Sequence, residues 1–319
     1  GMYSGSSVAN TVGSGSVTIP IMKKTGYDPD FAAAVEAAAS TGGQIMPPVM
    51  GAAAFLMAEM TEMPYSVIAT AAIFPAVLYF AGIFLMVHFE AKKLGLKGLP
   101  KEMIPNFFKL FFKKGYLFLP IVVLITTMSI GYTASRAACL AILASIIVSL
   151  FRKDTRLTPK TFIEALESGA KNTIGVAAAC SIAGIIVGIV SLTGIGLKLA
   201  DGLLLLSGGI DIIALFLTMI ACIILGMGVP TTANYVIMAT ITAPIILKLI
   251  PETPVLAAHM FVFYFGIVAD ITPPVALAAY AGSAISGGNP IRTGVIATRL
   301  AITAFIIPYM FVLNPAMLL

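Results

Sequence analysis

Long apolar runs, separated by short polar or basic stretches, dominate the pattern of the chain. A membrane-spanning helix needs about 20 largely apolar residues. Runs near that length lie at 65–87, 116–131, 133–151, 162–194 and 293–311. The fold class predicted from this pattern is an all-α integral membrane protein.

A basic segment at 90–115 follows the first of these runs and interleaves lysines with leucines and pairs of phenylalanines. That composition is typical of an amphipathic arm at the membrane interface, with the lipid bilayer as its partner. By the count of spans, a second basic loop at 152–160 returns to the same side, which favours a cytoplasmic position for both. The lysines of the arm are Lys92, Lys93, Lys97, Lys101, Lys109, Lys113 and Lys114.

Four apolar segments are interrupted by Gly, Pro, Ser, Thr or Asn, at 4–10, 41–48, 226–234 and 269–274. Irregular backbone at membrane depth persists only where it is buried in protein or lines a wet cavity. The alternative is that these residues only permit kinks and close helix packing. Because the interruptions recur in pairs, we expect them to be functional.

The interruptions belong to an internal duplication. Residues 224 positions apart match without a gap: Ala9-Asn10 and Ala233-Asn234, Val12 and Val236, Thr18 and Thr242, Pro20-Ile21 and Pro244-Ile245, and Lys24 and Lys248. Downstream, 45–49 matches 271–275 at an offset of 226. Counting spans places the two copies in opposite orientations. This predicts an inverted-topology repeat, with binding sites at discontinuous helices near the bilayer midplane.

Each copy is expected to contain a polar tip, a short helix and a longer helix broken at a Pro-Pro pair, which gives two re-entrant hairpins and two Pro-broken helices. The predicted division starts with a first transport repeat at 1–62, truncated at its start. Scaffold helices with the arm at 90–115 occupy 63–194. A second transport repeat follows at 195–290, and a C-terminal transmembrane helix at 291–319.

The composition excludes several classes of protein. With 59% hydrophobic and 10% charged residues and a mean hydropathy of +1.02, the chain cannot be a soluble domain. The net charge of +5 reflects the basic loops and does not indicate a nucleic-acid partner. Cys139, Cys180 and Cys222 are interpreted as buried hydrophobes. The sequence has no phosphate-binding loop and no nucleophile beside a base, so we expect no enzyme, catalytic residue or organic cofactor.

A broken helix exposes carbonyl groups at the end of one half and amide groups at the start of the next, which suit a sodium ion and an anion respectively. The first tip, facing 41–46, offers hydroxyl, amide and carbonyl oxygens without a carboxylate, a set that fits a monovalent cation. In the second copy the tip faces 270–272, and Asp270 replaces Gln44. Asp270 could instead be a helix-end residue in the water layer. His259 is interpreted as a satisfied interior histidine, and Glu36, Glu59 and Glu62 as helix-end or cavity residues.

Four stretches carry a resemblance to a known family: GSSVANTVGSGSVTIPIMKKTGY, AAASTGGQIMPPVMGAAAFLMAE, GMGVPTTANYVI and HMFVFYFGIVADITPPVALAAYAGSAISG. They resemble the large membrane subunit of tripartite ATP-independent periplasmic (TRAP) transporters, and most of all the fused permeases that work with TAXI-type receptors. The resemblance implies an elevator-type secondary transporter in a bacterial or archaeal inner membrane. Such a permease takes an organic anion, a carboxylate, from a periplasmic substrate-binding protein, uses a Na⁺ gradient, and works with a small membrane subunit that is separate or fused upstream.

The resemblance also implies site residues. One sodium ion would be held by Ser6, Ser7, Asn10, Gly42, Gly43 and Met46, and a second by Thr231, Thr232, Asn234, Asp270 and Thr272. The substrate would contact Ser7, Asn10, Gln44, Pro47, Pro230, Thr231 and Pro273.

Two alternatives stay open. One is H⁺ coupling through Asp270 and His259. The other is a truncated, non-transporting interaction subunit, since the chain opens at the tip itself and is expected to be the C-terminal part of a longer protein.

Overall fold

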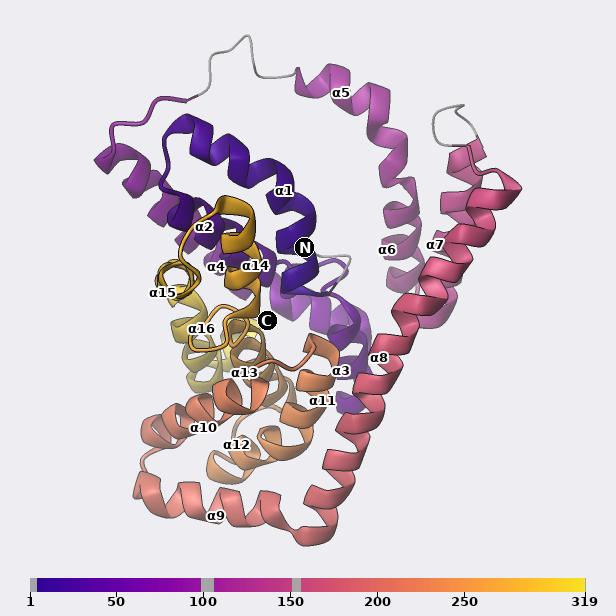
Figure 1. Ribbon diagram of the computed structural model, residues 1–319. Helices are drawn as coiled ribbons and strands as arrows, with labels where there is room; N and C mark the ends of the chain where they lie inside the picture. The colour runs from indigo at the N-terminus through magenta and orange to yellow at the C-terminus, as the bar shows by residue number, and fades with distance from the viewer. Residues whose placement is uncertain (1–4, 99–105, 151–155, 319) are drawn as a thin grey trace. The chain divides into compact units, whose positions relative to one another are not determined.

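The computed structural model describes residues 5–98, 106–150 and 156–318 of the chain (Figure 1). Throughout these ranges the regular elements are helices, and no strand occurs. Within the same ranges, four helical stretches are long and apolar enough to cross a membrane: Tyr65–Lys93, Pro159–Thr193, Thr231–Leu249 and Pro290–Leu313. Each of the last two consists of two consecutive helices. The prediction of an all-α fold is confirmed, and its apolar helices are those of an integral membrane protein.

The chain divides into two compact units. The larger contains the described parts of 1–63, 67–97 and 178–319, and the smaller contains 64–66 and the described parts of 98–177. Both predicted transport repeats fall within the larger unit. All four interrupted segments therefore lie in one compact unit.

The larger unit begins with helices whose ends follow local sequence signals. Ser6 caps α1 by accepting a hydrogen bond from the Ala9 amide, and Gly26 ends the helix in the left-handed conformation. Asp28 caps α2, which has a proline in its first turn. After α2 the chain passes through the Pro47-Pro48 pair, and α3 starts next to Gly51, whose φ is +74°. These helices are α1 (Ser7–Thr25), α2 (Pro29–Gly42), α3 (Ala52–Thr61) and α4 (Tyr65–Lys93).

The same unit continues in the second half of the chain from the later part of α8 (Pro159–Thr193). Its helices there are α9 (Ile195–Ser207), α10 (Asp211–Gly226), α11 (Thr231–Ile241), α12 (Ala243–Leu249), α13 (Val255–Val268), α14 (Leu277–Ser286), α15 (Pro290–Leu300) and α16 (Ile302–Leu313), before the short η3 (Pro315–Leu318). The final span predicted at 293–311 is thus two helices that meet at Ala301.

Helix bounds recur at the offsets found in the sequence. The bounds of α13 lie 226 positions after those of α2, and α11 and α12 together occupy the bounds of α1 displaced by 224. One element differs between the copies. Helix α1 continues through Pro20, whereas the second copy is divided at Thr242, with Pro244 in the first turn of α12.

The helices of the two segments interleave. Helix α1 packs against α2 and α14, while α11 packs against α13 and α3 (Figure 1). Each tip helix therefore touches the first half-helix of its own segment and the second half-helix of the other. At one junction a Cβ on Gly282 would lie 3.0 Å from the Ala33 carbonyl oxygen and 3.4 Å from Thr11 Cγ2, so a residue without a side chain permits the approach of α14 to α1 and α2.

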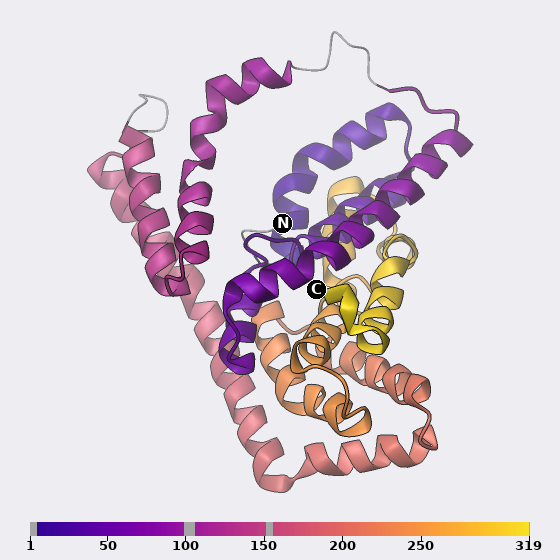
Figure 2. The same ribbon diagram turned by 180° about the vertical axis from the view of Figure 1, so that it is seen from behind.

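Helix α4, purple in Figure 2, runs obliquely across the bundle. The buried Tyr79 connects it to its neighbours, because the Tyr79 hydroxyl donates to the Ala38 carbonyl of α2 at 2.8 Å. The Tyr79 ring also fills the space beside Gly42 at the end of α2. One turn after Tyr79, Gly82 packs directly against Thr303 of α16.

The smaller unit contains α5 (Phe107–Lys114), η2 (Gly115–Phe118), α6 (Leu119–Ser129), α7 (Ala134–Leu150) and the first part of α8. Helix α5 is amphipathic, with exposed Phe108 and Phe112 and with lysines in its last turn. The predicted arm is not one helix: Lys92 and Lys93 lie in the last turn of α4, Lys97 follows in irregular chain, Lys109, Lys113 and Lys114 lie in α5, and Lys101 falls outside the described residues.

The cysteines differ in burial. Cys222 is buried and Cys180 is half-buried, but Cys139 on α7 is exposed. The prediction that all three are buried is therefore wrong for Cys139, since α7 presents most of its side chains to the exterior of this unit.

Candidate functional site

Ser7, the first residue of α1, contacts the break that follows α13. Its side chain is 1% exposed, and its hydroxyl donates a hydrogen bond of 2.5 Å to Asp270 Oδ2. Asp270 is itself 6% exposed and lies two residues beyond the last residue of α13. A buried carboxylate is thus bound by the N-terminal residue of a helix that lies 263 positions away in the chain.

Gln44 makes the corresponding contact from the first segment. It is fully buried and lies two residues beyond α2. The side-chain amide is assigned from its hydrogen-bond partners. In the satisfied orientation, its nitrogen donates to Thr231 Oγ1 at 2.8 Å and to the Gly5 carbonyl at 3.2 Å, and its oxygen accepts from the Ser7 amide at 3.2 Å. Gln44 therefore bridges the starts of α1 and α11.

The two contacts are equivalent under the sequence offsets. Ser7 and Thr231 are 224 positions apart, and Gln44 and Asp270 are 226 positions apart. Each tip hydroxyl therefore bonds to the break residue of the other copy. The sequence groups Asp270 with Thr231 and Thr232, but the side-chain bond of Asp270 goes to Ser7. The cause is the interleaved packing of α1 with α14 and of α11 with α3.

Opposite helix poles meet at this site. The N-terminal ends of α1 and α11 carry partial positive charge, and the C-terminal ends of α2 and α13 carry partial negative charge. The partial positive charge at the first pair of ends favours an anion. Carbonyls at the second pair of ends favour a cation. The arrangement has the electrostatic requirements for holding an anion and a cation side by side.

Asn234, in the first turns of α11, has an oxygen without a hydrogen-bond partner in the part of the chain that the structure describes. The residue is 2% exposed, and its Nδ2 donates to the Gly266 carbonyl of α13 at 2.8 Å. The amide lies between Gly226 and Gly266, where added Cβ atoms would come 2.9 Å and 3.2 Å from Nδ2. Among the described residues Asn234 Oδ1 and the hydroxyl of the fully buried Thr41 accept or donate no hydrogen bond. A buried oxygen without a partner can accept a bond from a water molecule or coordinate an ion.

The other predicted ligands occupy several environments. Ser6 caps α1, Asn10 is half-buried in its first turns, and Thr232 is half-buried in α11. The Thr272 hydroxyl donates to the Val268 carbonyl at 2.7 Å. The remaining predicted residues lie in or next to the breaks: Gly42 and Gly43 are buried, Met46, Pro47 and Pro273 are half-buried, and Pro230 is exposed.

His259 and Glu36 have definite partners. The Tyr235 hydroxyl and His259 Nδ1 lie 2.7 Å apart, which agrees with a satisfied interior histidine. Glu36 was not predicted as functional, but it lies within α2, and its carboxylate accepts hydrogen bonds from Ser14 and Thr18 of α1. A signal for this cluster was present in the sequence, because Ser14 and Thr18 are four residues apart and so share one face of a helix.

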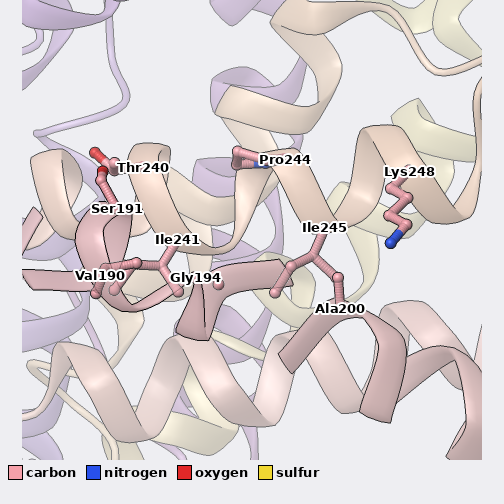
Figure 3. Close-up of a pocket in the computed structure, with 10 residues that line it drawn as sticks. Val190, Ser191, Gly194, Ala200, Thr240, Ile241, Pro244, Ile245 and Lys248 are labelled. Carbon is pink, nitrogen blue, oxygen red and sulfur yellow. The ribbon is translucent and has the colours of Figure 1, made fainter. Parts of the chain in front are cut away.

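A cavity of about 190 Å³ lies away from this site, between the end of α8, α9 and the later part of α11 with α12 (Figure 3). Its walls are mainly apolar, with Ile245 packed against Ala200. At its edge Lys248 forms an ion pair of 2.6 Å with Asp201 of α9. Thr231 is at the opposite end of α11, so this cavity is not part of the candidate site.

The chain is similar to known transport proteins. A family model described as "Tripartite ATP-independent periplasmic transporter, DctM component" matches residues 1–319. The sialic acid TRAP transporter large permease protein SiaM of Vibrio cholerae is 26% identical over 292 residues, which are 91% of this chain and 66% of that protein. The isethionate TRAP transporter permease protein DctMQ of Oleidesulfovibrio alaskensis is 27% identical over 289 residues, which are 90% of this chain and 44% of that protein.

The present chain spans less than two thirds of the length of either relative. The predicted resemblance to the large membrane subunit of TRAP transporters is nevertheless confirmed, because the family model matches from the first residue to the last. The chain belongs to the DctM component of the tripartite ATP-independent periplasmic transporters, a family of large membrane subunits of transporters and not of enzymes.

Proposed function

We propose that this chain is a permease subunit of a secondary active transporter that couples the uptake of an organic anion to a Na⁺ gradient. The observation that carries the proposal is the pair of bonds from Ser7 to Asp270 and from Gln44 to Thr231, which join the N-terminal ends of two helices at one buried place. Helix N-termini favour the anionic group of a substrate, and the facing helix C-termini favour a coupling cation.

The residues present fit sodium. Apart from Asp270, the predicted ligands supply only neutral hydroxyl, amide and carbonyl oxygens. Asn234 Oδ1 is a buried oxygen that no described residue hydrogen-bonds. Such a set suits a monovalent cation better than Ca²⁺. Because Asp270 bonds Ser7, we assign its negative charge to the tip of α1 as well as to the second sodium set. A bound sodium ion supplies positive charge that attracts the substrate anion.

The substrate class is an organic anion. The two relatives are named for sialic acid and isethionate, both of which are organic anions. The substrate would lie between the tips, where Ser7, Gln44 and Thr231 offer hydrogen bonds. Family membership supports delivery by a periplasmic substrate-binding protein and assembly with a small membrane subunit.

The transport movement follows from the repeat. We infer that the two copies are inverted, that their tips are re-entrant, and that the helices of the two copies move together as an elevator relative to scaffold helices. The amphipathic helix α5 would rest at the interface of a bacterial or archaeal inner membrane. The TAXI type and a fused arrangement with further upstream helices belong to the same proposal.

The proposal is tested by uptake into proteoliposomes that contain the chain within its full-length permease, with the small subunit and the receptor. Radiolabelled organic acids, sialic acid and isethionate among them, are offered one at a time. We expect uptake of the acid that the receptor binds to require an inward Na⁺ gradient. Uptake that does not depend on Na⁺ and is lost when the proton gradient is dissipated would contradict sodium coupling and favour H⁺ coupling. Absence of any gradient-driven uptake would contradict a transport role.

A further inference from the structure

Glu36 is a buried acid in the interior of α2. Its side chain is 9% exposed, and its carboxylate accepts hydrogen bonds from three hydroxyl groups. Ser14 and Thr18 on α1 donate to it, Thr18 at 2.5 Å, and Ser40 donates from one turn further along α2 at 3.4 Å. Three separate hydroxyls on two helices thus converge on one carboxylate.

The carboxylate has no cationic partner among the described residues. Burial of an ionised group is costly unless an opposite charge accompanies it. Glu36 is buried on one side only, because Ser14 and Thr18 form the exposed side of the cluster. Charged or titratable groups on the helices that pack against α2 are Lys23 and Lys24 on α1, Tyr280 on α14, Arg292 and Arg299 on α15, and Tyr65, Tyr79, His88, Glu90, Lys92 and Lys93 on α4. Within the described ranges no ion pair joins any of these to Glu36, and Lys23 donates to the Ser286 carbonyl while Arg292 pairs with Asp28 and Asp30.

The cluster offers only oxygen to a ligand. Two carboxylate oxygens and three hydroxyl oxygens converge there, and every hydroxyl oxygen has two lone pairs that it can turn toward a cation. Hard cations prefer oxygen ligands, and a single carboxylate balances one positive charge. A Cβ on Gly15 would lie 3.0 Å from Glu36 Cγ, so the glycine permits the close approach of α1. The chemistry is that of a monovalent cation site.

The cluster is separate from the tips. Ser14 lies about two helical turns beyond Ser7 along α1. At the sequence offsets, Met238, Val262 and Gly266 replace Ser14, Glu36 and Ser40 in the second copy, so the cluster exists in the first copy alone. Thr242, the counterpart of Thr18, also has a hydroxyl group, but this hydroxyl donates to the Met238 carbonyl one turn earlier.

We propose that Glu36, Ser14, Thr18 and Ser40 bind a sodium ion in addition to any ion held at the tips. The bound ion neutralises Glu36 and travels with the helices of the two copies. The binding itself stands on the side chains of α1 and α2. Only its role in coupling, one further positive charge moved per substrate, rests on the proposed function.

The binding test uses the assembled membrane complex. Its melting temperature is followed as NaCl replaces choline chloride at constant ionic strength and pH, because a ligand that binds the folded state raises stability with its concentration. We expect the sodium-dependent rise to shrink in Glu36→Gln and to be unchanged in Glu59→Gln, an exposed acid on α3. Ser14→Ala, which keeps the charge, should show a smaller rise than wild type. A full wild-type rise in both Glu36→Gln and Ser14→Ala would overturn the proposal.

A proton at Glu36 gives a different result. In choline chloride, the melting temperature of wild type could rise as the pH falls while that of Glu36→Gln does not. If, in addition, NaCl raises the melting temperature of both proteins equally, the occupant is a proton and the sodium assignment is wrong. A transport measurement distinguishes a failure of the Glu36 site from a failure of the proposed function. Sodium-independent uptake by wild type would contradict the proposed function alone. A charge-to-substrate ratio that falls by one in Glu36→Gln supports the coupling role, and an unchanged ratio removes that role.

Discussion

The hydroxyl of Ser7 donates a 2.5 Å hydrogen bond to the carboxylate of Asp270, although 263 positions separate the two residues. The partners come from opposite copies of the duplicated segment. Gln44 and Thr231 form the equivalent contact in the other direction. Each tip is therefore held by the break of the other copy, and a change at one tip acts on both halves of the site.

Replacing Asp270 with asparagine tests the charge at this junction. The change keeps the size of the side chain but removes the negative charge that accepts from Ser7. A hydrogen bond to a charged group contributes about 1.5–3 kcal/mol, so the apparent Na⁺ affinity of uptake should fall by roughly tenfold or more. The measurement is the initial uptake rate against Na⁺ concentration. Unchanged Na⁺ dependence in Asp270→Asn would remove Asp270 from the site.

The Gln44–Thr231 contact is tested by a double-mutant cycle. Thr231→Val removes the hydroxyl, and Gln44→Met removes the amide while keeping its length. A neutral hydrogen bond is worth about 0.5–1.5 kcal/mol, so Thr231→Val should weaken the apparent Na⁺ affinity a few-fold. Gln44→Met should weaken it further, because it also removes the bonds of Gln44 to Gly5 and Ser7. Since both changes delete the same Gln44–Thr231 bond, the double variant should lose less than the sum of the two. Strictly additive losses would show that the two side chains act independently.

Asn234 is predicted to hold sodium through its unpartnered Oδ1. In Asn234→Ala the sodium-dependent rise in melting temperature of the membrane complex should shrink, since a ligand oxygen is lost. Thr253→Ala is the matched control, because Thr253 also has a buried hydroxyl without a partner among the described residues but lies between α12 and α13. Equal sodium responses in Asn234→Ala and wild type would assign Asn234 to packing between Gly226 and Gly266 alone.

Gly42 is constrained by Tyr79. A Cβ at Gly42 would lie 2.2 Å from Tyr79 Cε1, so Gly42→Ala forces the ring or α4 to move. Overpacking of a core costs about 1–3 kcal/mol, and the melting temperature should fall. Gly13→Ala is the control: nothing lies within 4 Å of its Cβ position, and alanine favours a helix by about 1 kcal/mol. A Gly42→Ala variant as stable as Gly13→Ala would contradict the close packing of α2 against α4.

Much of the fold was predictable because the two copies of the repeat share short stretches of sequence. Both breaks could be found from the Pro-Pro pairs and from the matched residues around Asn10 and Asn234. The bounds of α2 and α13 differ by 226 positions, the offset of the Pro-Pro pairs. Caps such as Ser6 and Asp28 are likewise local signals. Helix ends can be found from sequence when short-range hydrogen bonds determine them.

The partners across the site were not predictable in the same way. Spacing along the chain shows that Asp270 lies in a break, but not which tip it meets, because that choice depends on the packing of α1 against α14. Glu36 was missed for a related reason. Its hydroxyl partners on α1 become neighbours only when α1 and α2 are packed together.

The most direct test of the central claim is to count sodium and anion entry in the same vesicles. Proteoliposomes with the assembled transporter and receptor are given ²²Na⁺ together with the labelled organic acid that the receptor binds. Because the bonds from Ser7 to Asp270 and from Gln44 to Thr231 place both tips at one site, ²²Na⁺ is predicted to enter only when the anion is present and in a fixed ratio to it. Anion entry without accompanying ²²Na⁺ would contradict sodium coupling at this site.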